Sequence, residues 1–481
     1  MIKRHRFTLA CCLLLSSASC RQKAVPVEKP LLAEELPQFD QPLLYAAWNQ
    51  EGSWPQFCHD PLHSGRSDVD LGSAEMELAW RFRPTTRAWT YQPGFAVWSS
   101  PASGTIAGRP LVVLGSQDRN VYAVDARTGE KAWEFRPGAP VFAAPALGVV
   151  GGRAMVFAAS LNRSIYGLDA VDGSRIWQCE TASWSFTAAR SVMASPTVVV
   201  DNRGEVLLLA GVWNADRSAT QNVQSGECLA ISAANGEVKW RRRLGSVPVS
   251  SPAFARVHGV ETVFVACGDG TVHALALADG AVLWTAVLNE ESHSSPSIGL
   301  VEGLAQVCIG SRLNSVFGLS ASSGARRWRA ETGYWVDATP AWLKEPSDGG
   351  PRAAVVAGSY DRSVYKWDAH DGTLQWQVLT GNYAYSSCAL ARIGQTPVVL
   401  AMSWDEHLYL FEAGRGQMLW RYQGGPLLWS HAYMGDSLWA SPAVIKAEGR
   451  PMLLFPAFDG VLYAFRPIQP TAASRSADPR H

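Results

Sequence analysis

The sequence has no excess of charge of either sign: 42 Lys and Arg residues balance 42 Asp and Glu residues, and neither sign forms a long block. It therefore lacks the basic footprint that binds phosphate backbones or anionic membranes, which argues against nucleic acid as a partner. A Gly-rich phosphate loop, a nucleophile elbow and a Cys/His/Asn constellation are also missing. Hydrolase chemistry consequently has no support.

Cysteine is sparse and scattered. After the N-terminal segment the chain has only Cys58, Cys179, Cys228, Cys267, Cys308 and Cys388, with no CxxC motif and no adjacent pair. This spacing favours small buried residues over a disulfide framework. Two candidate metal sites are incomplete as ligand sets: His59, Asp60 and His63 in HDPLH, and His293 with His431.

One long apolar run is present, and it lies at the N-terminus. Residues 1–20 combine basic Lys3, Arg4 and Arg6 with an apolar stretch, which predicts a secretory signal. Ala18 and Ser19 before Cys20 resemble the lipobox of bacterial lipoproteins, although Ser17 replaces the usual Leu. We predict export, with two open outcomes: lipidation of Cys20 or cleavage without a lipid. No other apolar run approaches the roughly 20 residues needed to span a bilayer.

The remaining chain divides by composition. Residues 21–53 are rich in Pro and Glu and predict a tether, and residues 468–481 predict a disordered tail. Residues 54–467 form one patterned block. The 20 Trp, 42 Gly and 28 Pro residues indicate many short strands and tight turns.

The patterned block is a repeat. VVLGSQDRNVYAVDARTGEKAW recurs as VFAASLNRSIYGLDAVDGSRIW, VVAGSYDRSVYKWDAHDGTLQW and further variants. The closing tryptophans are Trp80, Trp133, Trp177, Trp240, Trp284, Trp328, Trp376 and Trp420, and their commonest separation is 44 residues. Turn residues divide each period into four strands, the first opened by Ser-Pro or a variant. Units of this length and strand number predict a β-propeller.

The chain ends fix the number of blades. ELAWRF around Trp80 is a fourth strand without the preceding three, and the last copy stops after its third strand at Phe465. We therefore predict an all-β, eight-bladed propeller of four-stranded blades, in which the N-terminal strand completes the last blade and closes the ring. The regular tryptophans are expected to pack blade against blade.

These repeats resemble the pyrroloquinoline quinone (PQQ)-type propeller repeat family over roughly residues 54–467. The motifs are specific for fold, but the family includes both PQQ-dependent dehydrogenases and non-enzymatic relatives, among them the lipoprotein subunit of the outer-membrane β-barrel assembly machinery. The resemblance implies that a PQQ enzyme would hold PQQ and Ca²⁺ at the channel mouth, with Asp337 and a Trp as the obvious residues. The adjacent-Cys disulfide of the alcohol-oxidising members is missing, which disfavours PQQ.

Long insertions indicate a functional face. The linkers from a blade's Trp to the next blade's Pro slot span 12 positions in five cases, but 21 before Pro101, 19 before Pro196 and 22 before Pro442. A further insertion at 213–226 lies between the second and third strands of its blade. Strand alternation predicts that all four decorate one face, where binding loops of rigid scaffolds gather.

Register counting identifies candidate ligand-binding residues. The residue three positions before each Pro slot predicts a ring near the channel mouth: Trp98, Phe142, Met193, Val249, His293, Asp337, Tyr385 and Trp439. The long linkers add Trp184, Trp429 and His431. This mix of aromatic and few polar groups suits a ligand site. Trp98 and Trp439 have an alternative role as a hydrophobic plug.

The sequence thus predicts an exported, non-catalytic binding or scaffold propeller that recognises an envelope protein or a small ligand. We expect it in the periplasm or cell envelope, with an outer-membrane anchor if Cys20 is lipidated. The alternatives are a PQQ-dependent oxidoreductase and a glycan-binding module.

Overall fold

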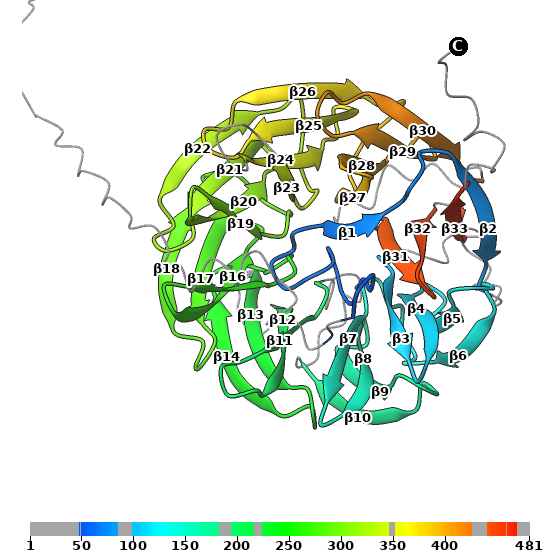
Figure 1. Ribbon diagram of the computed structural model, residues 1–481. Coiled ribbons are helices and arrows are strands. Elements are labelled where there is room, and N and C mark those ends of the chain that lie inside the picture. The colour runs from blue at the N-terminus through cyan, green and yellow to red at the C-terminus, as the bar shows by residue number, and fades with distance from the viewer. Residues whose placement is uncertain are drawn as a thin grey trace, which may run out of the picture.

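The computed structural model describes residues 48, 50–84, 99–181, 194–215, 224–345, 352–425, 440–457 and 459–468. Their regular structure consists of 33 β-strands in eight sheets around a central axis (Figure 1). The prediction of an eight-bladed propeller with four-stranded blades is therefore confirmed. No helix long and apolar enough to cross a membrane occurs in these residues.

The blades follow one another in chain order, and the strands of each blade are given from the centre outward. Blade 1 consists of β3 (Ala102–Ile106), β4 (Arg109–Gly115), β5 (Val121–Asp125) and β6 (Lys131–Phe135), and blade 2 of β7 (Ala146–Val150), β8 (Arg153–Ser160), β9 (Ser164–Asp169) and β10 (Arg175–Glu180). Blade 3 consists of β11 (Thr197–Val200), β12 (Val206–Ala215), β13 (Gln224–Ser232) and β14 (Val238–Leu244), and blade 4 of β15 (Ala253–Val257), β16 (Val260–Ala266), β17 (Thr271–Ala276) and β18 (Val282–Val287).

Blades 5 to 8 complete the ring and include the two strands from the N-terminal part of the chain. Blade 5 consists of β19 (Ser297–Val301), β20 (Leu304–Gly310), β21 (Ser315–Ser320) and β22 (Arg326–Glu331), and blade 6 of β23 (Ala341–Glu345), β24 (Arg352–Gly358), β25 (Ser363–Asp368) and β26 (Leu374–Leu379). Blade 7 consists of β27 (Ala389–Ile393), β28 (Thr396–Met402), β29 (His407–Glu412) and β30 (Met418–Gln423), with β1 (Arg66–Asp70) added at its inner edge. Blade 8 consists of β31 (Ala443–Ala447), β32 (Arg450–Pro456) and β33 (Leu462–Pro467), with β2 (Met76–Phe82) as its outermost strand.

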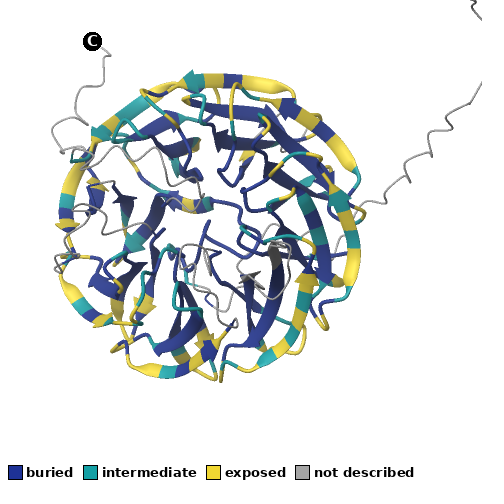
Figure 2. Ribbon diagram, turned by 180° about the vertical axis from the view of Figure 1, so that it is seen from behind, coloured by how far each residue is buried: buried dark blue, intermediate teal, exposed yellow. Residues whose placement is uncertain are grey.

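Burial falls from the middle of each blade to its rim. The third strand of blade 1, β5, is buried at every position, whereas the outermost strand of blade 3, β14, alternates between partly buried and exposed residues up to Arg243. Figure 2 shows the same gradient, with buried inner strands and exposed residues around the rim. Inner strands are apolar on both faces because each blade packs between two neighbours.

The ring closes as predicted. Strand β2, which contains Trp80, pairs antiparallel with β33, with Met76 opposite Pro467 and Phe82 opposite Leu462. It supplies the missing outermost strand of blade 8. A strand from the start of the propeller thus holds its last blade in place.

The repeated tryptophans dock each blade onto the next. Trp328 Nε1 donates a hydrogen bond of 2.8 Å to the carbonyl of Ala369 in the following blade. Its ring lies over Gly372, where φ is 77° and an added Cβ would come within 2.9 Å of the indole. Glycine provides both the turn conformation and the space. The same indole-to-carbonyl bond occurs at Trp80, Trp133, Trp177, Trp240, Trp284 and Trp376.

The Ser-Pro motifs form a second ring of connections nearer the axis. The backbone N–H of Ala144 donates to Ser195 Oγ of the next blade at 2.9 Å, and Ser195 N–H donates in turn to Ser251 Oγ. Equivalent bonds link Ser251 to Ser295, Thr339 to Ser387 and Ser441 to Ser100. The hydroxyl before the proline, or before Cys388 in blade 7, therefore connects adjacent blades.

The central channel is filled by the chain itself. We call residues 50–65 the lead-in; within it, residues 53–65 are all buried. The innermost strand of every blade donates a backbone N–H to it, over 2.7–2.9 Å. From blade 1 to blade 8 the donors are Ser103, Leu147, Val198, Phe254, Ile298, Trp342, Leu390 and Lys446, and the acceptors are Trp54, Pro55, Gln56, Pro61, Leu62, Ser64, Gly65 and Gly52.

The lead-in leaves the centre as β1, which pairs in parallel with β27, the innermost strand of blade 7 (Figure 1). The sequence patterns did not predict this strand. They also left open whether the channel is plugged, and the lead-in is what occupies it. The chain enters beside blades 8 and 1, contacts all eight blades and then crosses to the rim as β2.

Candidate functional site

One end of the propeller carries the linkers between blades together with the turns between second and third strands; we call it the linker face. In blade 6 the N–H of Tyr360, in such a turn, donates to the carbonyl of Trp335 in the preceding linker at 2.9 Å. Trp404 and Tyr383 make the equivalent bond in blade 7. In blades 6 and 7 the turn and the linker therefore share one face. Residues 85–98, 182–193, 216–223 and 426–439, which make up most of the four long insertions, lie outside the described residues. Because the insertion at 213–226 extends the β12–β13 hairpin, it also starts from this face.

Acidic and phenolic side chains hold the linkers down. In blade 6, Asp361 accepts hydrogen bonds from Tyr365 Oη at 2.5 Å and from the linker N–H of Gly333 at 2.7 Å. Burial, together with Asp361, raises the pKa of Tyr365 to about 12. Asp118 with Tyr122 and Asp459 with Tyr463 form similar pairs. The pairs are structural, because the same pairing recurs around the ring.

The predicted ring at the channel mouth is described at five positions. His293, Asp337 and Tyr385 are buried, and Phe142 and Val249 are partly buried. The candidates Trp98, Trp184, Trp429, His431 and Trp439 lie outside the described residues, as does Cys20. The three described candidates, His293, Asp337 and Tyr385, thus have little contact with solvent.

His293 and Asp337 belong to one charged network. Arg312 donates to both carboxylate oxygens of Asp337, from Nε at 3.0 Å and from Nη2 at 2.9 Å. Glu291 lies 2.8 Å from His293 Nε2 and 3.5 Å from Arg312 Nη1. Burial disfavours the charged guanidinium, but hydrogen bonds and charge from Asp337 outweigh it and raise the Arg312 pKa. The guanidinium is held between two carboxylates, a stable bidentate arrangement.

This arrangement does not fit the PQQ and Ca²⁺ site that the family resemblance implies. Asp337, the expected base or metal ligand, has both oxygens engaged by Arg312. No group of three or more His, Cys, Asp or Glu side chains suited to a metal ion occurs among the described residues. The space on the axis below the mouth is taken by the lead-in. The described residues therefore offer neither a calcium ligand set nor a cofactor floor.

The HDPLH segment is structural as well. Asp60 is fully buried and accepts bonds from the N–H groups of Leu62 and Ser64, at 2.9 and 3.1 Å, and from the Ser64 hydroxyl. His59 lies 3.3 Å from the same carboxylate. Burial would raise the pKa of Asp60, but these bonds and His59 lower it overall. His63 instead faces the carbonyl of Pro296 at 3.0 Å. These residues shape the lead-in and do not converge on a metal.

An aromatic cluster covers the linker face of blades 6 and 7. Tyr334 stacks on Trp335, with ring centroids 5.0 Å apart and planes 9° from parallel. Contacts then run from Trp335 to Tyr360 at 5.9 Å, from Tyr360 to Tyr383 at 5.4 Å and from Tyr383 to Trp404 at 5.5 Å. Tyr385 lies beneath, against Tyr360 and Trp404. We call these six residues the aromatic sector.

Sequence reasoning missed most of the aromatic sector. Counting at three positions before the Pro slot found only Tyr385 among its six residues. Counting at five positions before the slot would have found Trp335 and Tyr383, and the second residue of the turn after the second strand would have given Tyr360 and Trp404. These positions lie in linkers of ordinary length, so linker length alone does not identify them.

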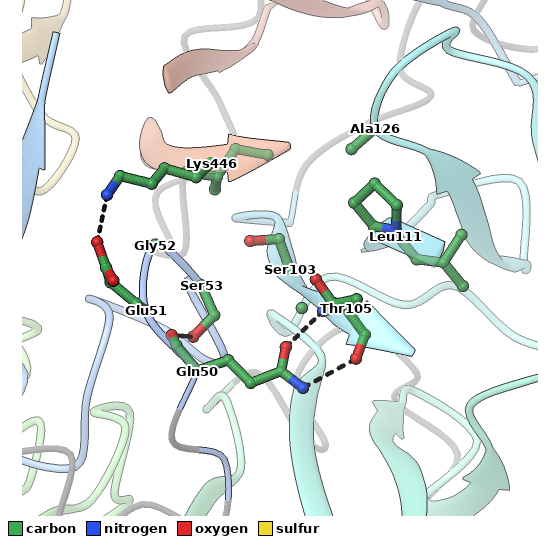
Figure 3. Close-up of a pocket in the computed structure, with 12 residues that line it drawn as sticks. Gln50, Glu51, Gly52, Ser53, Ser103, Thr105, Leu111, Ala126 and Lys446 are labelled. Carbon is green, nitrogen blue, oxygen red and sulfur yellow. Dashed lines mark hydrogen bonds and ion pairs between the residues drawn. The ribbon is translucent and has the colours of Figure 1, made fainter. Parts of the chain in front are cut away.

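A small pocket lies where the lead-in enters, between blades 8 and 1 (Figure 3). The Gln50 side chain bonds both backbone groups of Thr105, at 2.7 and 2.9 Å, and Lys446 pairs with Glu51. Its polar side chains are thus engaged with one another. The pocket is a seam between the lead-in and the innermost strands, and we assign it no ligand.

The fold and linker face define a class: an eight-bladed propeller built from PQQ-type repeats. The family model described as "Outer membrane protein assembly factor BamB" matches residues 71–259, 183–307 and 268–437. The overlapping matches follow from the repeat, and together they span more than half of the chain. The chain belongs to this family. No curated protein sequence matches it.

Solved structures share the fold across both functional classes. A europium-containing methanol dehydrogenase is 12% identical, with a TM-score of 0.64, covering 89% of this chain and 100% of that chain. Quinohemoprotein alcohol dehydrogenase from Comamonas testosteroni is 13% identical, with a TM-score of 0.61 and coverages of 89% and 84%. BamB from Moraxella catarrhalis is 16% identical, with a TM-score of 0.51 and coverages of 82% and 98%. At these identities the likeness is one of fold alone.

Proposed function

We propose that the protein is an exported, non-catalytic binding or scaffold propeller that recognises a partner in the cell envelope through its linker face. The observation that carries the proposal is the aromatic sector, which keeps Tyr334 42% exposed and Tyr383 36% exposed on a rigid scaffold. Partly exposed aromatic side chains are enriched at protein interfaces. Family membership with an outer-membrane assembly factor supports the same reading.

The proposed location follows from the N-terminal sequence. The signal-like residues 1–20 support export to the periplasm, and Cys20 is the proposed lipid attachment site. A diacylglyceryl group on Cys20, with its two acyl chains, would tether the propeller to a membrane without inserting any strand of it. Mass spectrometry of the mature N-terminus tests this part independently of binding.

Partner capture with matched variants tests the proposed face. Leu313 is 57% exposed in the linker-face turn of blade 5, and Val260 is 45% exposed at the start of β16, next to the β15–β16 turn at the opposite face. We expect an envelope partner that co-purifies with the wild type to be lost from Leu313→Glu and retained by Val260→Glu. Equal retention by both variants would remove the linker face from the proposal.

A PQQ-dependent oxidoreductase is the competing function, since dehydrogenases of this class share the fold. Incubation with PQQ and Ca²⁺ tests it directly, by the absorbance of bound cofactor after gel filtration and by dye reduction with alcohols or sugars. The binding proposal predicts neither signal. Stoichiometric PQQ retention would overturn it.

A further inference from the structure

The linker face is electrically divided, although the chain as a whole is neutral. For each blade we count the charged residues in two segments. One is the seven linker residues that end three positions before the Pro slot, and the other is the four-residue turn that follows the second strand. In blades 5 to 7 these segments are 287–293, 311–314, 331–337, 359–362, 379–385 and 403–406. They contain seven carboxylates and two guanidinium groups, a net charge of −5.

The corresponding described segments of blades 1, 2 and 4 have the opposite net charge. In blades 1, 2 and 4 the corresponding segments are 116–119, 136–142, 160–163, 243–249 and 267–270. They contain two carboxylates and four guanidinium groups, a net charge of +2. Gln117, Leu161 and Gly268 stand where the aromatic sector has Tyr360 and Trp404. The acidic charge therefore coincides with the aromatic sector.

Some of this acidic charge faces solvent. The Glu331 side chain is 80% exposed at the end of the strand that leads to Tyr334, and it pairs there with Arg329 Nη1 at 2.9 Å. The Glu291 side chain is 54% exposed. The one guanidinium of the mouth network, Arg312, is neutralised by Asp337 and Glu291. Exposed carboxylates near exposed aromatic rings create a surface that attracts cations in two ways. The carboxylates act at long range through their charge, and the ring quadrupoles act at contact distance.

The protein itself shows this type of contact. The Arg312 guanidinium carbon lies 4.9 Å from the centroid of the Trp335 ring, within cation–π distance. Tyr334 stacks against Trp335 and is partly open to solvent, as is Tyr383 in the next blade. Because these two tyrosines sit in successive linkers, one extended chain can reach both.

We propose that the aromatic sector and its acidic rim bind an extended cationic segment of a partner protein, with Arg or Lys side chains over Tyr334 and Tyr383. This inference deepens the proposed function by naming the chemistry of the partner. Charge complementarity selects this occupant, since a neutral glycan would not need the carboxylates and a second copy of the acidic sector would be repelled.

The test is a direct titration of the purified full-length protein. The probe is a fluorescein-labelled peptide of four Arg-Gly-Pro repeats, and the charge controls are the same peptide with Glu or Gln in place of Arg. Fluorescence anisotropy at about 50 mM salt should show binding of the Arg peptide only, weakened several-fold at about 500 mM salt because the charges are screened. Equal binding of the Glu or Gln peptide, or no binding of the Arg peptide, would overturn the proposal.

Matched variants locate the site. Tyr334→Ala combined with Tyr383→Ala should weaken Arg-peptide binding about tenfold. Glu331→Lys should weaken it several-fold at low salt and have little effect at high salt. Glu302→Lys is the charge control, because Glu302 is 76% exposed in the β19–β20 turn at the opposite face. If Glu302→Lys weakens binding as much as Glu331→Lys, the attraction is not local and the proposal fails.

Other occupants give different results. A neutral oligosaccharide that binds the wild type, loses affinity in the double tyrosine variant and competes with no cationic peptide would replace this proposal. A concentration-dependent dimer, measured by sedimentation and absent from the double tyrosine variant, would also replace this proposal. Failure of the peptide titration alone would leave the proposed function standing if partner capture still depends on Leu313.

Discussion

The interfaces between blades and the linker face use the repeat in opposite ways. At the interfaces seven tryptophans make the same bond to the next blade, and the lead-in accepts a hydrogen bond from all eight innermost strands. On the linker face, equivalent positions carry Tyr360 and Trp404 in blades 6 and 7 but Gln117 and Gly268 in blades 1 and 4. Uniform positions hold the ring together, whereas positions that differ between blades are free to serve recognition.

The largest expected effect tests the uniform part of this comparison. Trp328→Ala should lower the free energy of unfolding by about 3–5 kcal/mol, because it leaves a cavity beside Gly372 and removes the bond to Ala369. Trp420 is the matched control, since it is only half-buried and packs on Phe465 in the blade completed by β2. Trp420→Ala should cost clearly less in chemical denaturation. Equal losses would mean that the indole-to-carbonyl bond and its glycine contribute nothing special.

The lead-in gives the next largest effect. Asp60→Ala leaves the N–H groups of Leu62 and Ser64 without their acceptor in the buried centre. We expect a loss of about 3 kcal/mol in the free energy of unfolding. Ser64→Ala, which removes only one donor to Asp60, provides the milder comparison. A wild-type stability for Asp60→Ala would show that the lead-in is not a structural centre.

Low pH should destabilise the packing of the lead-in in the centre of the propeller. Burial lowers the pKa of His63 to about 4, whereas the unfolded chain titrates near 6.5. Between these values the unfolded state binds a proton that the folded state does not. The contribution of neutral, buried His63 to the free energy of unfolding is therefore complete above pH 6.5 and falls as the pH drops toward 4. The loss is about 3 kcal/mol. His63→Gln should flatten the dependence of unfolding on pH over this range, and His258→Gln, at an exposed turn, should not; identical slopes for all three proteins would refute the assignment.

The smallest effect on stability belongs to the linker face. Tyr334→Ala and Tyr383→Ala remove partly exposed side chains, and each should change the free energy of unfolding by less than about 0.5 kcal/mol. Binding of the partner should nevertheless weaken. If either substitution destabilised the protein as much as Trp328→Ala does, the aromatic sector would belong to the uniform framework and the comparison would collapse.

The fold could be predicted because its signals are local and repeated. The Trp spacing gave the period, and the isolated strand around Trp80 gave the closure that β2 makes with β33. The path of the lead-in could not be predicted, because its bonds join single residues such as Gln56 and Leu62 to strands far along the chain. Such contacts occur once and leave no periodic pattern.

The candidate site was only partly accessible to sequence reasoning. Register counting selected His293 and Asp337 as candidates, but it could not show that Arg312 engages Asp337, since that pairing joins a turn to a linker. The proposed roles of Trp98, Trp184, Trp429, His431 and Trp439 stay predictions. The stacking of Tyr334 on Trp335 depends on linker conformation and not on spacing alone.

Site-specific photocrosslinking tests the central claim, that the linker face of blades 5 to 7 is the recognition surface, most directly. A photoreactive amino acid replaces Leu313, exposed in that face, or Val260, exposed at the opposite face. Irradiation of cells should yield a discrete adduct from position 313 whose partner peptide, identified by mass spectrometry, is rich in Lys or Arg, and no adduct from position 260. An adduct from position 260 alone would contradict the claim.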